Sequence, residues 1–291
     1  MLRQRLISGA LFISALVAVY LYAPLAWIGV VLLVLTFLGL RETCALFASA
    51  GLPAFTTTAT VGGTLSLAAA WFYKCGLISG WVALGVPSVA MVGLLTASLR
   101  AVPSAEGLRR IAATLAVQMY VPFFMLFLGL ILNGWGGEDG RQLAVFFVAM
   151  VKATDIGAYF TGCAIGRHKL IPHISPAKTW EGSAGGIALA YAAGAGFYFG
   201  CDGVIGPFRM GLVDLAVLPL LMAVSGSIGD LVESMIKRAA QMKDSSKMIA
   251  GMGGILDVID SLLLAAPVFY LYVLARVTAQ SGDFALAFLF P

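Results

Sequence analysis

The sequence predicts an all-α polytopic integral membrane protein with about nine transmembrane helices and a cytoplasmic N-terminus. The chain is 60% hydrophobic and only 11% charged, and its mean hydropathy is +0.97. So much apolar side-chain surface cannot be hidden inside a soluble globule of 291 residues. The apolar residues also fall into segments of about 17 to 25 residues, the length that a helix needs to cross a bilayer.

The predicted spans follow one another with short connections. They cover residues 5–22, 25–40, 55–73, 77–97, 111–132, 142–163, 183–200, 211–233 and 253–275. The first two are shorter than average and meet at Pro24. Arg3 and Arg5 precede the first span as they would in a signal peptide, but no small-x-small cleavage site follows and the next span begins at once. We therefore expect a retained first helix.

The basic residues support this orientation, because Lys and Arg collect in the cytoplasmic loops of membrane proteins. Thirteen fall in the segments assigned to the inside: Arg3, Arg5, Arg41, Arg100, Arg109, Arg110, Arg167, Lys169, Lys178, Lys237, Arg238, Lys243 and Lys247. Four fall outside: Lys74, Arg141, Arg209 and Arg276. The cytoplasmic face is thus basic and suited to anionic lipid or phosphate, although the positive-inside rule alone also explains the residues up to Arg110.

The cysteine pattern argues against a zinc or iron–sulfur site. The four cysteines have no CxxC spacing, and only two histidines accompany them. Cys75 and Cys201 both fall on the outer side in this topology, so a disulfide between them remains open.

The eighth span carries a polar stripe that favours a metal-bound phosphate. Ser227, Asp230, Ser234 and Lys237 follow at intervals of three, four and three residues, which places them on one helix face. Carboxylate and hydroxyl oxygens are the hard ligands that Mg2+ prefers, and Mg2+ leaves its other positions to water and substrate phosphates. The alternative for Glu233, Lys237 and Arg238 is a helix end with an i,i+4 ion pair and snorkelling cations.

The ninth span offers two more carboxylates, Asp257 and Asp260, which follow a glycine-rich turn. Helix capping would explain one of them, since acidic residues are favoured at helix N-termini. Capping does not require both. We expect Asp230 and Asp257, on neighbouring helices, to converge on one cation.

The polar segment 166–186 adds a candidate anion site. Ser175 as N-cap and Pro176 at the first helical position would start a helix whose free N–H groups lie near Lys178 and Thr179. The spacing is not that of a Walker A motif, and an ordinary capped basic loop is the alternative. In the sixth span, Lys152 and Asp155 are three residues apart and can form a buried ion pair.

Several of these motifs together resemble the phosphatidate cytidylyltransferase, or CDP-diacylglycerol synthase, family. They are Ser-Pro-Ala-Lys-Thr-Trp-Glu-Gly at 175–182, Gly-Asp-Leu-Val-Glu-Ser at 229–234 with Lys237 and Arg238, Lys243 with Asp244, Gly-Gly-Ile-Leu-Asp at 253–257 with Asp260, Asp-Ile-Gly-Ala-Tyr at 155–159 and Gly-Arg-His-Lys-Leu at 166–170. The resemblance covers about residues 153–267, while the N-terminal half matches only in hydropathy.

The resemblance implies a helical membrane enzyme that joins CTP to phosphatidate, with Mg2+ as cofactor and a second cation left open. It makes Asp230 and Asp257 the expected metal ligands. We expect Lys178, Ser234, Lys237 and Asp260 to act in catalysis. The expected substrate-binding residues are Ser175, Thr179, Glu233, Arg238, Lys243, Asp244 and Asp155.

The resemblance also sets the expected organisation and partners. Residues 1–140 form an N-terminal membrane scaffold that serves dimerisation, and residues 141–291 form the catalytic membrane region. We expect a homodimer in the cytoplasmic membrane that binds CTP, phosphatidate and membrane lipid on its cytoplasmic side, and no nucleic acid. The alternatives are a CTP-dependent transferase or kinase that acts on another lipid phosphate or alcohol, and an ion-coupled transporter.

Three positions depart from the usual signature of this family: Ala250 where proline is common, Met252 where histidine is common, and Val258 where arginine is common. They leave every acidic candidate in place. Without that histidine and that arginine, the chain lacks any substrate contact that these two side chains would make.

Overall fold

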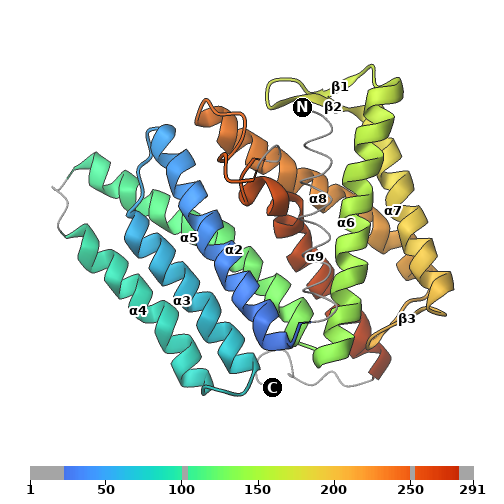
Figure 1. Cartoon of the computed structure of the whole chain (residues 1–291), viewed down its shortest axis with the longest axis horizontal. Helices are drawn as coiled ribbons and strands as arrows, with labels where there is room; N and C mark the ends of the chain where they lie inside the picture. Colours follow the sequence, from blue (N-terminus) through green and yellow to red (C-terminus); the bar gives the residue numbers. More distant parts are fainter. Residues whose placement is uncertain (1–22, 100–103, 250–252, 282–291) are drawn as a thin grey trace.

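The computed structural model describes residues 23–99, 104–249 and 253–281 as a bundle of long helices with two small hairpins (Figure 1). The helices are α2 (Leu25–Ser49), α3 (Thr56–Lys74), α4 (Gly80–Ser98), α5 (Ala105–Asn133), α6 (Gly137–Ile165), α7 (Trp180–Gly200), α8 (Leu212–Ala239) and α9 (Leu256–Ser281). The strands are β1 (Lys169–Ile171), β2 (Ser175–Thr179), β3 (Val204–Ile205) and β4 (Phe208–Arg209).

The helices confirm a polytopic all-α membrane architecture. Six of them, α2, α4, α5, α6, α8 and α9, are long and apolar enough to cross a membrane. The predicted spans 55–73 and 183–200 coincide with α3 and α7, whose glycine, alanine and threonine content makes them less hydrophobic. Small residues of this kind let transmembrane helices pack closely. The predicted span 5–22 lies outside the described residues, so the total of nine helices stays a prediction.

The connections alternate between the two ends of the bundle. The C-terminal ends of α2, α4, α6 and α8 lie at the upper end in Figure 1, together with the β1–β2 hairpin, and the starts of α4, α6 and α8 lie at the lower end. This is the alternation that consecutive spans require. In the sequence, most of the basic residues stand in or beside the segments that follow these helix ends.

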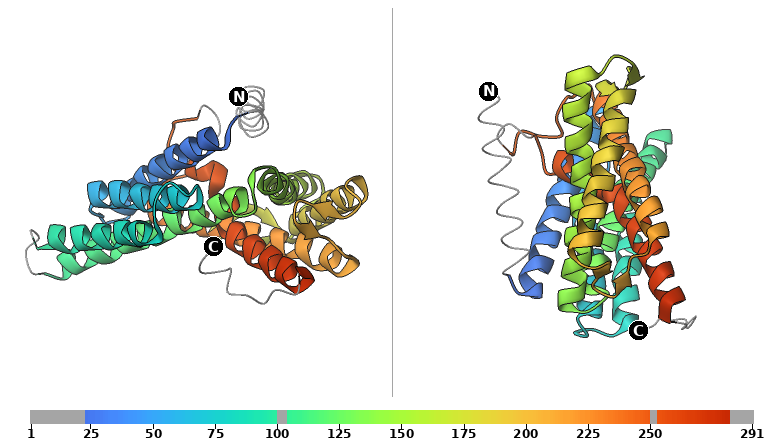
Figure 2. Two further views of the ribbon diagram at one scale, coloured as in Figure 1. Left: turned by 90° about the horizontal axis from the view of Figure 1, so that it is seen from below. Right: turned by 90° about the vertical axis from the view of Figure 1, so that its right-hand side faces the viewer.

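The helices form two groups that meet along α5 and α9. Helices α2 to α5 contact one another on one side, and α6 to α9 do so on the other (Figure 2). Phe146 and Phe147 of α6 pack against Phe269 of α9 and are fully buried, so the second group has a continuous aromatic core. The predicted division at residues 140 and 141 falls inside α6.

Helices α6 and α7 approach each other most closely at glycines. A Cβ atom on Gly157 would lie 2.6 Å from the carbonyl oxygen of Gly185, too close for any side chain. The contact therefore requires the absence of a side chain there. It fixes α7, and with it the β1–β2 hairpin, against α6.

One sequence prediction for this region is wrong, namely that a helix begins at Ser175 and Pro176. Residues Ser175–Thr179 form strand β2, which pairs antiparallel with β1, and Thr179 is instead the N-cap of α7, where its hydroxyl accepts a hydrogen bond from the Gly182 N–H at 3.1 Å. Pairing with β1 provides hydrogen-bond partners for the backbone of β2, and the helix begins only after the Thr179 cap. The anion site expected at that helix start is absent from β2.

The four cysteines have no part in the predicted site. All four are free, so Cys75 and Cys201 form no disulfide.

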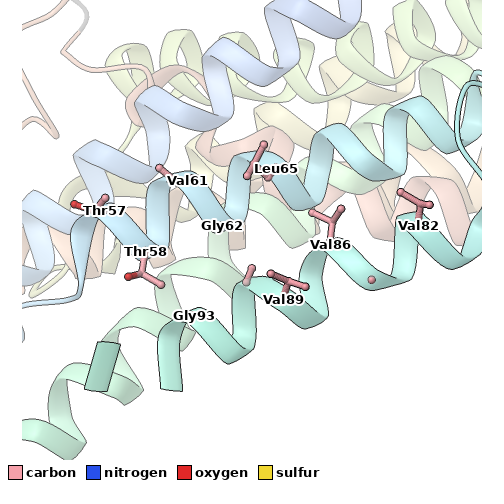
Figure 3. A pocket seen from close by; sticks show the side chains of 11 residues that line it. Thr57, Thr58, Val61, Gly62, Leu65, Val82, Val86, Val89 and Gly93 are labelled. Atoms are coloured by element: carbon pink, nitrogen blue, oxygen red, sulfur yellow. The ribbon is translucent and has the colours of Figure 1, made fainter. Parts of the chain in front are cut away.

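An apolar cavity of about 610 Å³ lies between α3 and α4. It is lined by apolar and small residues such as Val61, Leu65 and Val89 (Figure 3). None of the predicted site residues lines it. Only Leu94 of α4 is buried, as expected of a helix that faces lipid.

Candidate active site

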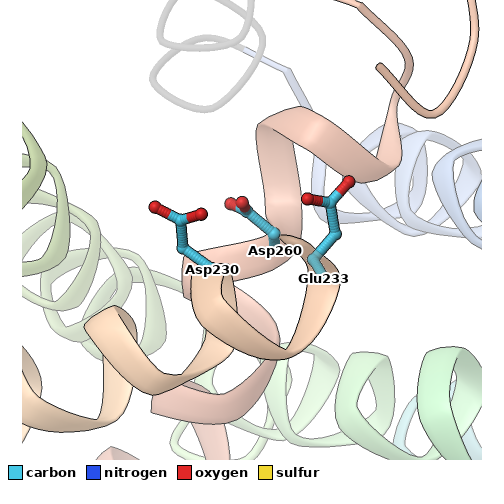
Figure 4. A group of neighbouring side chains, drawn as sticks. All are labelled: Asp230, Glu233 and Asp260. Carbon is cyan, nitrogen blue, oxygen red and sulfur yellow. The ribbon is translucent and has the colours of Figure 1, made fainter. Parts of the chain in front are cut away.

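Three carboxylates form a cluster between α8 and α9. Asp230 and Glu233 of α8 and Asp260 of α9 each place an oxygen within 4.8 Å of the others, and all three point to the same side (Figure 4). Glu233 is fully buried, with 0% of its surface exposed, and Asp260 is 8% exposed. The close approach depends on Gly229, where a Cβ atom would lie 2.5 Å from the Asp260 carbonyl oxygen.

Two lysines border this carboxylate cluster. Lys178 Nζ of β2 lies 3.0 Å from Asp230 Oδ2 and donates to the Ser227 carbonyl oxygen at 3.2 Å. Lys237 forms an ion pair with Glu233, which confirms the i,i+4 pair expected in α8. The structure thus brings a positive charge from the hairpin to Asp230 and another, from α8, to Glu233.

The hydroxyl of Ser234 also belongs to the cluster, since its Oγ donates to Asp230 Oδ1 at 3.3 Å. Part of the stripe predicted on the eighth span is therefore confirmed: Asp230 forms an ion pair with Lys178 and accepts a hydrogen bond from the Ser234 hydroxyl, while Lys237 pairs with Glu233. These contacts orient the carboxylate toward the cluster.

Asp257 lies in a different arrangement. Its Oδ1 accepts from Lys237 Nζ at 2.6 Å, and its Oδ2 accepts from Gly254 N, Ser245 N and Ser245 Oγ at 2.7, 2.8 and 2.7 Å. Protein donors therefore occupy both oxygens. The carboxylate grouped with Asp230 is that of Asp260, and the metal-binding role of Asp257 stays a prediction. Helix capping was the alternative for one of Asp257 and Asp260. Asp257 fits it, because it accepts from the Gly254 N–H at the start of α9.

Lys152 and Asp155 form the predicted ion pair, with 3.1 Å between Nζ and Oδ2. The structure adds Ser261 of α9, whose Oγ donates to Asp155 Oδ2 at 3.0 Å and lies 3.0 Å from Lys152 Nζ. Lys152 also donates to the Val258 carbonyl oxygen at 3.2 Å. The pair ties α6 to α9 directly beside Asp260. Val258 is one of the three departures from the family signature. The other two, Ala250 and Met252, lie outside the described residues.

Besides Lys178, two further contacts hold the β1–β2 hairpin against α8 and α7. Arg238 Nε at the end of α8 donates to the Ile174 carbonyl oxygen at 3.3 Å. At the hairpin base, ahead of the apolar part of α7, Glu181 accepts from the His168 ring at 2.5 Å and from the backbone N–H groups of Arg167 and His168. The His168 contact, with those backbone donors, lowers the pKa of Glu181 to about 2.

The remaining predicted residues lie around this cluster without touching it. Ser175 is in β2, and Thr179 is buried as the α7 cap. Lys243 and Asp244 are exposed in the segment between α8 and α9. Their roles in substrate binding stay predictions.

Sequence reasoning missed one buried charge beside this region, Glu42 of α2. It is 5% exposed and accepts hydrogen bonds from the backbone N–H groups of Ile255 and Leu256, at the start of α9. The available signal was a glutamate beside Arg41 just after the predicted span 25–40, in a chain with few charges.

The chemistry of the donor set fits a divalent cation. The three carboxylates are hard oxygen donors, the kind that Mg2+ prefers. Glu233 Oε1 is buried and has no hydrogen-bond partner in the described part of the chain. Because buried carboxylates this close repel one another, a cation between them would relieve an uncompensated charge. The arrangement can hold a cation beside two ammonium groups, which suits a polyphosphate.

The chain matches the cytidylyltransferase family over residues 3–275. The phosphatidate cytidylyltransferase of Brucella suis is 41% identical over 152 residues, which make up 52% of this chain and 54% of that protein. That of Haemophilus influenzae is 42% identical over 140 residues, 46% of this chain and 48% of the relative. That of Mycobacterium bovis is 28% identical over 277 residues, 91% of this chain and 86% of the relative. The chain thus spans about half the length of the Brucella and Haemophilus proteins.

Proposed function

Because the chain belongs to the cytidylyltransferase family, we propose that it transfers the cytidylyl group of CTP to phosphatidate, giving CDP-diacylglycerol and pyrophosphate. The similar proteins of Brucella suis and Haemophilus influenzae are named phosphatidate cytidylyltransferases. The observation that carries the proposal is the cluster of Asp230, Glu233 and Asp260, with Lys178 paired to Asp230 and Lys237 paired to Glu233. A divalent cation and two ammonium groups are what the phosphates of a nucleotide require.

We assign the cation, Mg2+, to Asp230 and Asp260, with Glu233 as a third oxygen donor. When bound, Mg2+ would neutralise the nucleotide phosphates and the charge that develops on departing pyrophosphate. Asp257 then serves to hold Lys237, because its oxygens already accept from four protein donors. One cation accounts for this donor set, and a second is not needed to satisfy it.

The protein's own residues position two anionic reactants. Lys178 and Lys237 donate to nucleotide phosphates, Arg238 and Lys243 add positive charge, and Ser234 orients Asp230. A lipid phosphate monoester is already largely deprotonated near neutral pH, since its second pKa is about 6, so its oxygen attacks the α-phosphorus without a general base. Catalysis therefore rests on charge neutralisation and in-line placement.

The experiment that tests this activity is an assay of detergent-purified protein with labelled CTP and a series of lipid phosphates and lipid alcohols. We expect a labelled CDP-lipid with phosphatidate, no product from the alcohols, and no reaction after complete chelation of divalent cations. A product with a different lipid phosphate would move the assignment to the related transferases. Transfer of phosphate from CTP to an alcohol would make the protein a lipid kinase.

An ion-coupled transporter is disfavoured by the position of the cluster. Transporters place such carboxylates near the bilayer midplane, whereas here they lie near the C-terminal end of α8 and the N-terminal end of α9. Solute flux without turnover of CTP would reverse this preference.

We propose that the protein lies in the cytoplasmic membrane as a homodimer with the site facing the cytoplasm, where CTP is found. The positive-inside pattern supports this orientation, and the family resemblance supports the dimer. The β1–β2 hairpin, the C-terminal end of α8 and the start of α9 lie at the same end of the bundle (Figure 1). Phosphatidate would enter from the membrane, and the enzyme needs no nucleic acid.

This orientation predicts the labelling of single cysteines in a cysteine-free background. In intact cells, cysteines at Ser104 and Lys247 should be protected from a membrane-impermeant thiol reagent, and a cysteine at Gly137 should react. All three positions are exposed in the protein, so burial would not mask the result. Labelling in the reverse pattern would place the site on the face that lacks CTP.

A further inference from the structure

Glu42 is a charged residue of α2 whose hydrogen-bond partners all belong to one distant segment. Its Oε1 accepts from Ser246 Oγ at 2.7 Å and Ile255 N at 3.0 Å. Its Oε2 accepts from Leu256 N at 2.8 Å and lies 3.0 Å from Ser245 Oγ, whose single proton is closer to Asp257. With 5% exposure, the carboxylate has exchanged water for these three donors and the nearby Ser245 hydroxyl. A buried charge so fully hydrogen-bonded fixes the geometry of the groups around it.

The contacts place Glu42 at the N-terminus of α9. The first N–H groups of a helix have no partner within the helix, and the helix dipole favours a negative charge there. Ile255 and Leu256 supply two such groups, and Glu42 accepts from both. A residue of α2 thus caps α9, more than 200 positions further along the chain.

Gly254 shows that this approach is built into the backbone. A Cβ atom at this position would collide with both Glu42 carboxylate oxygens and with Ser245 Oγ. The glycine therefore leaves the space that the carboxylate occupies.

The effect of Glu42 extends to the carboxylate cluster through Asp257. Ser245 Oγ lies within hydrogen-bond distance of both Glu42 and Asp257, and Asp257 accepts from Lys237, the ion-pair partner of Glu233. Asp260 lies one turn after Asp257 on the same helix. The position of the whole first turn of α9 relative to α8 thus depends on what holds the α9 N-terminus.

We propose that Glu42 is a positioning residue for the cation site: by fixing Ser245, Ser246 and the start of α9, it sets the distance between Asp260 and Asp230. Glu42 lies outside residues 153–267, whose motifs carry the family resemblance. The inference rests on the proposed function for the cation site and for its activity readout.

The test compares Glu42→Gln with the matched control Glu106→Gln, in which an exposed glutamate of α5 is changed. Two quantities are measured on the detergent-purified full chain: the Mg2+ concentration that gives half-maximal formation of CDP-diacylglycerol, and the binding of Mn2+ by electron paramagnetic resonance with no lipid present. We expect Glu42→Gln to raise both the half-maximal concentration and the Mn2+ dissociation constant by about tenfold. Glu106→Gln should change neither.

A merely structural role for Glu42 would lower the amount of folded protein and leave both concentrations unchanged, and that result would overturn the inference. Should Glu42→Gln fail to accumulate, Ser246→Ala removes one donor to the carboxylate and is expected to raise both values by about threefold; no change in that variant also overturns it. A wild-type protein that binds Mn2+ but does not turn over CTP would refute the proposed function, while the Mn2+ measurement still decides the role of Glu42.

Discussion

Replacement of Asp230 by asparagine is expected to lower the rate of CDP-diacylglycerol formation by about a hundredfold or more. The change keeps the shape of the side chain and removes the charge that would hold the cation and pair with Lys178. The rate is measured with purified protein at saturating CTP and phosphatidate.

The control for this variant is Asp139→Asn, in the first turn of α6, where an exposed aspartate lies outside the cluster. It should keep the wild-type rate. Both proteins should insert and purify in wild-type amounts, since Asp230 is only partly buried. A near-normal rate in Asp230→Asn would remove Asp230 from the cation site.

Replacement of Lys237 by methionine is expected to lower the free energy of unfolding by about 3 to 5 kcal/mol, because it leaves two buried carboxylates without their cation. Lys237 is the ion-pair partner of both Glu233 and Asp257. Methionine has a similar length, so the loss would come from charge and not from a cavity. The measurement is thermal unfolding in detergent, with Lys169→Met as the exposed control.

A second substitution separates the electrostatic cause from packing. Adding Glu233→Gln to Lys237→Met removes one of the unpaired charges, so the double variant should recover part of the lost stability. If the double variant is less stable by the sum of the two single effects, the ion pair is not the cause.

Much of the architecture could be predicted from the sequence because hydrophobic length and charge distribution are local properties. The span 142–163 falls within α6, and the span 211–233 begins at the N-cap of α8. The Lys152–Asp155 and Glu233–Lys237 pairs follow from helix periodicity. The same periodicity placed Asp230 and Ser234 on one face, and their hydrogen bond confirms it.

The errors and omissions have a common physical source, contacts between segments far apart in the chain. The capping pattern at Ser175 predicted a helix, but pairing with β1 decides the structure of that segment. Spacing alone could not tell whether Asp257 or Asp260 lies beside Asp230, because that depends on how α9 is set against α8 by Gly229 and by Glu42. Glu42 itself has no local partner that a sequence pattern could reveal.

In the proposed site, Asp230 and Asp260 hold the cation that binds the CTP phosphates, while Asp257 holds Lys237. The binding of Mn2+ in the presence of CTP and the absence of lipid, followed by electron paramagnetic resonance, distinguishes these roles. We expect Asp260→Asn to weaken Mn2+ binding by about a hundredfold, as Asp230→Asn does, and Asp257→Asn to weaken it by about tenfold or less. Binding that survives Asp260→Asn and is abolished by Asp257→Asn would contradict this assignment.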